Sequence, residues 1–287
     1  MKNTSRRDFI KSSSAIGSFF ILPSGLLAKA PNSKICTAHI GTGGKGRIDT
    51  MYLAKHSNVE VIGLCDVDYA HGKIDTWSKQ FKSATAFQDY REMLAKLDDK
   101  IDVVSISTPD HTHYPATMDA MERGKHIYLQ KPLTHKLKEA RQLAEFAKEK
   151  GLTTQMGIQN QSREAYRLAR HYIKKGVIGK ISKVYVWSFK TWGYDGEPFK
   201  EKSEIPQSLD WNLWLGTAPK HDYVSKVYHP GQWRKLLDFG CGTLGDMGIH
   251  IFDTPFKALD LKDPKWVEAD CREPNGFGHA EKNMVRY

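Results

Sequence analysis

Gly41-Thr42-Gly43-Gly44-Lys45-Gly46 follows the apolar run 35–40 and precedes a helix-like stretch. A glycine loop between a strand and a helix is typical of sites that hold the diphosphate of a dinucleotide. Gly41 permits the tight turn, Gly43 lets backbone amides approach the diphosphate, and Gly46 lets the helix pack close to the strand. The amides at the helix N-terminus then bind the anion. All six residues are therefore predicted to form a cofactor-binding loop.

An acidic residue follows the next predicted strand, which covers residues 59–64. This residue, Asp66, lies 20 residues after Gly46. A carboxylate at this place accepts hydrogen bonds from both ribose hydroxyls of NAD and repels the 2′-phosphate of NADP. Asp66 therefore favours NAD. Lys45 and Arg47 could partly offset that repulsion, so the choice between the two cofactors stays open at this point.

Apolar runs alternate with amphipathic helices up to residue 158, which indicates a parallel sheet covered by helices on both faces. In this part of the chain we also expect strands at 103–107, 126–129 and 153–158, and helices at 69–81, 88–97, 115–123 and 135–150. Thr134 is the expected N-terminal cap of the last helix, and Gly151 ends it. The sequence predicts a doubly wound Rossmann domain over residues 31–158 and a second α/β domain over residues 159–287.

The first 30 residues have the pattern of an export signal. Ser5-Arg6-Arg7-Asp8-Phe9-Ile10-Lys11 precedes a weakly apolar stretch at 15–27, and Ala28-Lys29-Ala30 offers small residues for cleavage. The apolar stretch is too short, and too interrupted by glycine and proline, to span a bilayer. We expect the twin-arginine translocase as a partner during export, no stable membrane span, and a periplasmic or exported mature protein. The alternative is a basic disordered tail.

The charge and the cysteines exclude several classes of protein. The formal net charge is +10, and the first 30 residues hold five Lys or Arg against one Asp, so about +6 remains without them. The other basic residues are mixed with acids and form no block interleaved with aromatics, so no nucleic-acid partner is predicted. The four cysteines have no paired spacing and indicate neither a zinc site nor a disulfide framework.

Several motifs occur in one fixed order. After the glycine loop come Ser107-Thr108-Pro109-Asp110-His111-Thr112-His113, then Gly124-Lys125-His126, then Gln130-Lys131-Pro132. With these motifs the chain from residue 32 onward resembles the Gfo/Idh/MocA oxidoreductases. Trp211-Asn212-Leu213-Trp214-Leu215-Gly216 and Gly245-Asp246-Met247-Gly248-Ile249-His250 are similar to motifs of an exported branch of that family. The family's usual tripeptide is Glu-Lys-Pro, so Gln130 keeps the lysine but removes one negative charge beside it.

The resemblance implies a Rossmann domain that binds NAD or NADP, joined to an α/β domain whose open-faced, mostly antiparallel sheet presents a sugar or polyol to the nicotinamide. By position, Lys131 matches the family's catalytic lysine, and Asp246 and His250 match its Asp-x-x-x-His pair. Hydride removal from a carbinol carbon also requires loss of the hydroxyl proton. His250 is the candidate base and Lys131 would stabilise the developing alkoxide. Asp246, on the same helix face as His250, would orient its ring or bind a neighbouring hydroxyl.

Other residues near the predicted strand ends are expected to line the cofactor crevice, where ligands bind in doubly wound sheets. They are Thr108, Pro109, His113, Gln130 and Lys131. His111 and His113 are expected on a loop, and whether either contacts the nicotinamide or only closes the loop stays open. Asp246, His250 and Asp253 could also be drawn as metal ligands, but they lack a second shell, so no metal is predicted. The region between 187 and 233 is rich in aromatic residues, some of which are expected in a core and others on a surface that stacks on a sugar ring; they include Trp187, Trp192, Trp211, Trp214, Tyr223, Tyr228 and Trp233.

The sequence thus predicts an NAD-dependent oxidoreductase acting on a carbohydrate. One alternative is a glycosidase or lyase in which bound NAD transiently oxidises a sugar carbon before elimination and re-reduction. A second alternative is a dinucleotide-binding protein without turnover. Residues 182–188, 266–270 and 284–287 are interpreted as strands of the second sheet, with the last stopping midway. We therefore expect a truncated chain with an exposed sheet edge through which copies associate as a homo-oligomer.

Overall fold

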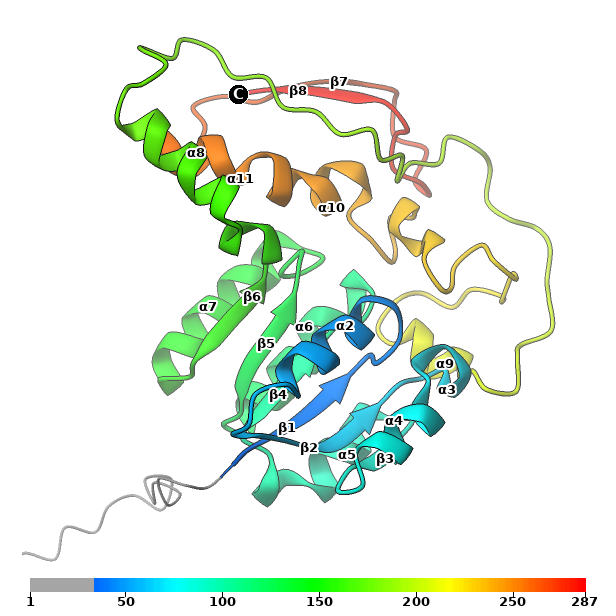
Figure 1. The fold of residues 1–287 in the computed structure, drawn as a ribbon. Helices are drawn as coiled ribbons and strands as arrows, with labels where there is room; N and C mark the ends of the chain where they lie inside the picture. The colour runs from blue at the N-terminus through cyan, green and yellow to red at the C-terminus, as the bar shows by residue number, and fades with distance from the viewer. Residues whose placement is uncertain (1–33) are drawn as a thin grey trace, which may run out of the picture. The chain divides into compact units, whose positions relative to one another are not determined.

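A six-stranded parallel sheet forms the first part of the computed structural model, which describes residues 34–287 (Figure 1). The order across the sheet is β3-β2-β1-β4-β5-β6. The strands are β1 (Ile35–Ile40), β2 (Val59–Cys65), β3 (Thr85–Phe87), β4 (Val103–Ile106), β5 (His126–Gln130) and β6 (Thr154–Gly157). This is the order of a doubly wound Rossmann sheet, which confirms the predicted fold class. The predicted export signal lies outside the described residues.

Helical segments connect these parallel strands, as parallel neighbours require. They are α2 (Gly44–Leu53), α3 (Tyr69–Gly72), α4 (Ile74–Gln80), α5 (Tyr90–Lys96), the 3₁₀ turn η1 (Asp98–Lys100), α6 (Asp110–Glu122) and α7 (Leu137–Lys150). The strand order reverses between β1 and β4, which pair directly with one another. Ligands bind at the carboxyl ends of the strands at such a reversal. The sheet therefore places its crevice beside Gly41 and Ser107.

Three helix boundaries differ from the prediction. The helix expected at 69–81 is divided at Lys73, whose φ of 54° is left-handed. The helix expected at 115–123 begins at Asp110, because the backbone N–H of His111 in its first turn donates to the carbonyl of Phe239, 3.2 Å away. Thr134 does not cap α7. Its hydroxyl donates to the Lys136 carbonyl, and Lys136 occupies the cap position.

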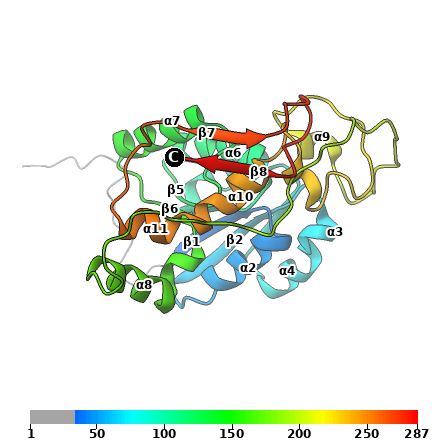
Figure 2. The ribbon, with the colours of Figure 1, turned by 90° about the horizontal axis from the view of Figure 1, so that it is seen from above.

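The second part of the chain is helical with one small sheet. Its elements are η2 (Gln159–Ser162), α8 (Glu164–Lys174), α9 (Trp211–Leu215), η3 (Gln232–Lys235), α10 (Gly242–Ile251), α11 (Asp253–Ala258), β7 (Glu268–Cys271) and β8 (Asn283–Arg286). β7 and β8 pair antiparallel with each other. Figure 1 shows α8, α10 and α11 between this pair and the six-stranded sheet, and Figure 2 shows the pair from above. No helix in residues 34–287 is long and apolar enough to cross a membrane.

The strand expected at 182–188 is absent from the described chain. That segment is neither helix nor strand and belongs to neither sheet of the described residues. Figure 1 shows the chain after α8 passing the β7–β8 pair and returning to the six-stranded sheet at α9. The β-branched and aromatic run at 184–187 therefore does not form a strand here.

Two apolar cores support the crevice. One lies within the parallel sheet and its helices, around residues such as Ala38, Val104 and Leu129. The other is an aromatic cluster of the second part, with Trp211, Trp214 and Phe239 among its members and Val67 of the sheet domain packed against it. The aromatic cluster therefore anchors the second part at the carboxyl end of β2.

Residues 208–234, which we call the covering segment, hydrogen-bond to the turn that follows β2. The Asp210 amide donates to the Val67 carbonyl at 2.8 Å, and the Tyr69 amide donates to the Ser208 carbonyl at 3.0 Å. The Asp68 carboxylate accepts from the Ser208 hydroxyl at 2.8 Å and lies 3.0 Å from a His229 ring nitrogen. The covering segment is thus held by backbone and side-chain contacts at the turn that follows β2.

Candidate functional site

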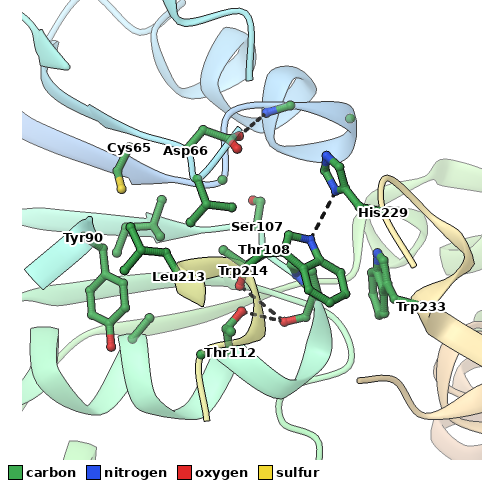
Figure 3. A pocket seen from close by; sticks show the side chains of 18 of the residues that line it. Cys65, Asp66, Tyr90, Ser107, Thr108, Thr112, Leu213, Trp214, His229 and Trp233 are labelled. Atoms are coloured by element: carbon green, nitrogen blue, oxygen red, sulfur yellow. Dashed lines mark hydrogen bonds between the residues drawn. The ribbon is translucent and has the colours of Figure 1, made fainter. Parts of the chain in front are cut away.

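A cavity of about 440 Å³ lies at the carboxyl ends of β1, β2, β4 and β5. One wall is formed by the glycine loop and the ends of these strands, and the opposite wall by the covering segment. Figure 3 shows Asp66, Ser107 and Thr108 on one side of this space and Trp214, His229 and Trp233 on the other. The cavity has the size typical of a small-molecule or cofactor site.

The glycine loop has the close approaches that its sequence predicted. Gly41 has a φ of +79°, and a Cβ there would lie 2.7 Å from the Ser107 carbonyl oxygen. A Cβ on Gly43 would lie 2.7 Å from a ring nitrogen of His71, and one on Gly46 would overlap the Gly41 carbonyl. Gly41, Gly43, Gly44 and Lys45 line the cavity, whereas Thr42 and Gly46 are placed behind it. The loop therefore presents its backbone to the cavity, with the His71 ring packed against Gly43.

Asp66 braces this loop from the end of β2. One carboxylate oxygen accepts from the backbone amides of Thr42 at 2.9 Å and Gly43 at 3.1 Å, and the other accepts from the Asp68 amide at 3.0 Å. Burial raises the pKa of Asp66, although these three amide bonds favour its ionised form. A carboxylate has about four acceptor sites. Since Asp66 also lines the cavity, it can accept further hydrogen bonds from a ligand there.

The loop expected after β4 is the first turn of α6, and it divides the predicted residues into two groups. Thr108 and Pro109 line the cavity. His111 and His113 are buried and do not. The His113 ring lies 2.8 Å from the Pro132 carbonyl and 2.9 Å from the Thr108 carbonyl. Burial lowers the pKa of each histidine to about 4, so both are neutral at pH 7 and support the cavity wall from behind.

Lys131 and Asp246, which the sequence assigned to catalysis, are in contact. The Lys131 Nζ lies 2.6 Å from a carboxylate oxygen of Asp246 and 2.9 Å from its backbone carbonyl. The two side chains are 15% and 9% exposed. Burial raises the pKa of Asp246, but Lys131 and Arg234 outweigh it and lower that pKa below the ordinary value. Lys131 lines the cavity with its ammonium oriented by this ion pair.

His250 lies one helical turn after Asp246 on α10 and outside the cavity lining. Burial, followed by the charge of Lys131, lowers its pKa, so the ring is neutral at pH 7. Its buried Nδ1 has no hydrogen-bond partner within residues 34–287. The same described residues contain no group of three His, Cys, Asp or Glu able to hold a metal, so Asp253 is not brought together with Asp246 and His250 as a ligand set.

Four charged residues of the cavity lining, Asp89, Arg91, Asp110 and Arg234, were missed by the sequence analysis, and two of them lie near Lys131 and Asp246. The Arg234 Nε donates to Asp246 at 3.3 Å, and its guanidinium lies 4.2 Å from the Trp233 ring centre. Asp110 accepts from the Cys241 amide at 3.1 Å, and burial raises its pKa to about 7. The Trp-Arg pair at 233–234, within an aromatic-rich stretch, was the available signal for Arg234. Asp110 was quoted only as part of a motif.

The structure also divides the aromatic residues between core and surface. Trp211, Tyr223 and Tyr228 belong to the buried aromatic cluster, and Trp187 is 68% exposed away from it. Trp214 and Trp233 belong to the cluster and also line the cavity. These two rings are therefore the ones placed to contact a bound molecule.

The residues present fit a dinucleotide. Gly41, Gly43 and Gly44 line the cavity at the start of α2, where a diphosphate would bind, and Asp66 lies beside them for the ribose. Lys131 stands at the other end of the cavity, at the end of β5. A nicotinamide ring there would lie between the lysine and the walls formed by Thr108 and Trp214.

Comparisons with known proteins agree with this geometry. Residues 35–158 match a family model described as "Oxidoreductase family, NAD-binding Rossmann fold", and residues 167–283 match its companion, "Oxidoreductase family, C-terminal alpha/beta domain". Both models describe the Gfo/Idh/MocA family.

Curated relatives include a levoglucosan dehydrogenase of Pseudarthrobacter phenanthrenivorans, 28% identical over 61% of this chain and 37% of that protein. A scyllo-inositol 2-dehydrogenase (NAD(+)) of Bacillus subtilis is 34% identical over 48% of this chain and 40% of that protein. The chain thus spans about two fifths of the length of these relatives. A crystal structure of an NAD-binding protein from Listeria innocua has the same fold, with a TM-score of 0.60 and 21% identity over 88% of this chain and 63% of that one. The chain belongs to the Gfo/Idh/MocA oxidoreductase family, with an NAD-binding Rossmann fold followed by the family's C-terminal α/β domain.

Proposed function

We propose that this protein is an NAD-dependent oxidoreductase that transfers hydride between the cofactor and a hydroxyl-bearing carbon of a sugar or polyol. Residues 31–158 bind the cofactor and residues 159–287 contribute to the substrate site. The observation that carries the proposal is that Lys131, ion-paired with Asp246, lines the same cavity as the glycine loop and Asp66. The dehydrogenase names of the relatives support the choice of substrate class.

Bound NAD supplies the hydride acceptor, and the protein manages the substrate oxygen. The Lys131 ammonium donates a hydrogen bond to that oxygen and stabilises the negative charge that develops as the hydride leaves. Asp246 holds the ammonium in place through its carboxylate and its backbone carbonyl. Trp214 and Trp233 exclude water from the adjoining walls of the cavity.

His250 is the proton acceptor in this proposal. Its ring is half-buried and its pKa is lowered, so it carries a free basic nitrogen at pH 7. Its buried Nδ1 has no hydrogen-bond partner within residues 34–287, and the ring lies outside the cavity lining. Substrate binding would have to bring the hydroxyl within hydrogen-bond distance of the ring.

Asp66 supports NAD rather than NADP as the cofactor. Its carboxylate is held by three backbone amides at the end of β2, so it cannot turn away from a ribose in the cavity. A 2′-phosphate on that ribose would meet a fixed negative charge.

The test is to incubate the purified protein with NAD and a panel of sugars and inositols and to follow NADH by absorbance. Stoichiometric NADH with at least one member of the panel is expected. Lys131→Met should lower kcat by about 10²-fold to 10⁴-fold while NAD still binds, because one hydrogen bond to the developing charge is lost. The control is Lys174→Met, which removes a half-exposed lysine of α8 and should change neither kcat nor NAD binding. A Lys131→Met protein with unaltered kcat would refute the assignment.

We also propose that residues 1–30 direct export through the twin-arginine pathway, on the strength of the Arg6-Arg7 motif. A fusion of these residues to a fluorescent reporter should reach the periplasm of a bacterial host. Replacing both arginines with lysine should retain it in the cytoplasm. Export of the lysine variant at the same level would contradict the proposal.

A further inference from the structure

Asp49 of α2 is a buried carboxylate that no part of the proposed chemistry uses. Its side chain is 3% exposed. It accepts from the Lys45 Nζ at 2.7 Å, the Ser107 hydroxyl at 3.0 Å and the Gln130 side-chain amide at 2.7 Å. A buried charge is stable in a protein only when it is paired and hydrogen-bonded in this way.

The three donors come from three different segments at the same wall of the crevice. Lys45 belongs to the glycine loop, Ser107 follows β4, and Gln130 ends β5 immediately before Lys131. All three residues line the cavity. One carboxylate therefore ties the loop that receives the diphosphate to the strand end that carries the catalytic lysine.

The contact between Asp49 and Gln130 explains the departure from the Glu-Lys-Pro tripeptide. A carboxylate accepts hydrogen bonds and cannot donate them, so Asp49 requires a donor at position 130. Gln130 provides one, and its amide lies against Gly157, where a Cβ would come within 2.6 Å of it. A glutamate at position 130 would instead place two carboxylates about 2.7 Å apart. The negative charge that Gln130 lacks is thus supplied beside it by Asp49 of α2.

We propose that Asp49 and Gln130 form a positioning pair that holds the glycine loop and Lys131 in a fixed relation, with Asp49 replacing the carboxylate absent from position 130. This inference rests on the proposed binding of NAD in the crevice. It also assigns the charge of Lys45 to Asp49, so that Lys45 does not offset the repulsion between Asp66 and a 2′-phosphate.

A cycle of variants tests the pair: Gln130→Glu, Asp49→Asn and the double variant. NAD affinity is measured by calorimetry, and the melting temperature is measured without cofactor. Each single variant should weaken NAD binding about tenfold at pH 8, because a hydrogen bond to a buried charge is lost. In the double variant the new amide at position 49 donates to the new carboxylate at position 130. Affinity and melting temperature should therefore return close to those of the unaltered protein.

The pH dependence separates this role from general damage to the fold. In Gln130→Glu the two carboxylates can share one proton in acid, so NAD affinity should recover on lowering the pH from 8 to about 5.5. The other ionisable groups around the pair are Lys45 on α2 and Tyr128 on β5. The double variant should not show this recovery. Gln155→Glu, which makes the same charge change at an exposed position of β6, should behave as the unaltered protein.

The outcomes are distinct. Single variants that bind NAD normally, or a double variant weaker than both, would overturn the pairing. If Gln130→Glu is insoluble, a soluble double variant that binds NAD still supports it, because only the second change can have rescued the first. If the unaltered protein binds no NAD, the proposed function fails and so does the link to the cofactor. The melting temperatures of the cycle then still decide whether Asp49 and Gln130 act as a pair.

Discussion

Replacing Asp246 with asparagine should destabilise the protein by removing one charge that compensates two cations. The carboxylate lies 2.6 Å from the Lys131 Nζ and 3.3 Å from the Arg234 Nε, and it is mostly buried. Asparagine keeps an acceptor of similar shape but leaves both cations uncompensated. Charged hydrogen bonds of this kind contribute about 1.5–3 kcal/mol each, so we expect a loss of about 2–3 kcal/mol. For a chain of this size that lowers the melting temperature by on the order of 5–10 °C.

The effect of Asp246→Asn should depend on pH in a defined direction. The pKa of Asp246 in the folded protein is lower than its ordinary value. Its stabilisation is therefore complete above the ordinary carboxyl pKa of about 4 and is lost as the pH falls through the lower folded value. Differential scanning fluorimetry from pH 8 to pH 3 should show a gap between the two proteins that closes only at the acid end.

A matched control removes the same charge from an exposed pair. Asp260 lies 2.8 Å from the Lys174 Nζ, but the lysine and aspartate side chains are 48% and 73% exposed. Asp260→Asn should leave the melting temperature unchanged within error, because exposed ion pairs contribute little. The electrostatic explanation of this contact is wrong if Asp246→Asn has the same melting temperature as the unaltered protein at pH 7. It is also wrong if the difference in melting temperature between the two proteins is as large at pH 3 as at pH 7.

Three further outcomes are expected. Gly46→Ala should abolish NAD binding measured by calorimetry, because the new Cβ overlaps the Gly41 carbonyl. Gly124→Ala is the control: a Cβ there meets open space, so NAD affinity should stay intact, and the φ of +74° should cost about 1 kcal/mol of stability. Burial lowers the pKa of His39, His111 and His113 to about 4. The free energy of unfolding should therefore fall as the pH drops from about 6.5 to 4. In urea titrations His39→Gln should make this dependence on pH less steep. Asp66→Ala should weaken NAD binding by about tenfold or more, because the hydrogen bonds to the ribose are lost. NADP binding should weaken less, because the repulsion between the carboxylate and the 2′-phosphate is lost as well. An equal loss of affinity for both cofactors would contradict the role of Asp66.

The nucleotide-binding half of the fold could be predicted because its signals are local. Strand runs, helix ends at glycine, and the glycine loop each depend on neighbouring residues in the sequence. Asp66 follows its strand directly, so its place beside the loop follows from the strand order. Lys131 and Asp246 are 115 residues apart, and only the resemblance to a family brought them together before the structure did.

The remainder depended on tertiary partners that no sequence pattern reveals. α6 begins at Asp110 because the carbonyl of Phe239, far along the chain, accepts a hydrogen bond from its first turn. The segment 182–188 has the β-branched and aromatic residues of a strand but pairs with neither sheet of the described residues. No sequence pattern marks Asp49, and its contact with Gln130, 81 residues away, appears only in the structure.

The covering segment has a consequence for how a coenzyme would come and go. The Asp210–Val67 and Ser208–Tyr69 backbone bonds, together with the contacts of Asp68, join it to the turn beside the adenosine end of the crevice. A dinucleotide bound between this turn and the covering segment would be held on two sides, so we expect these contacts to slow its dissociation.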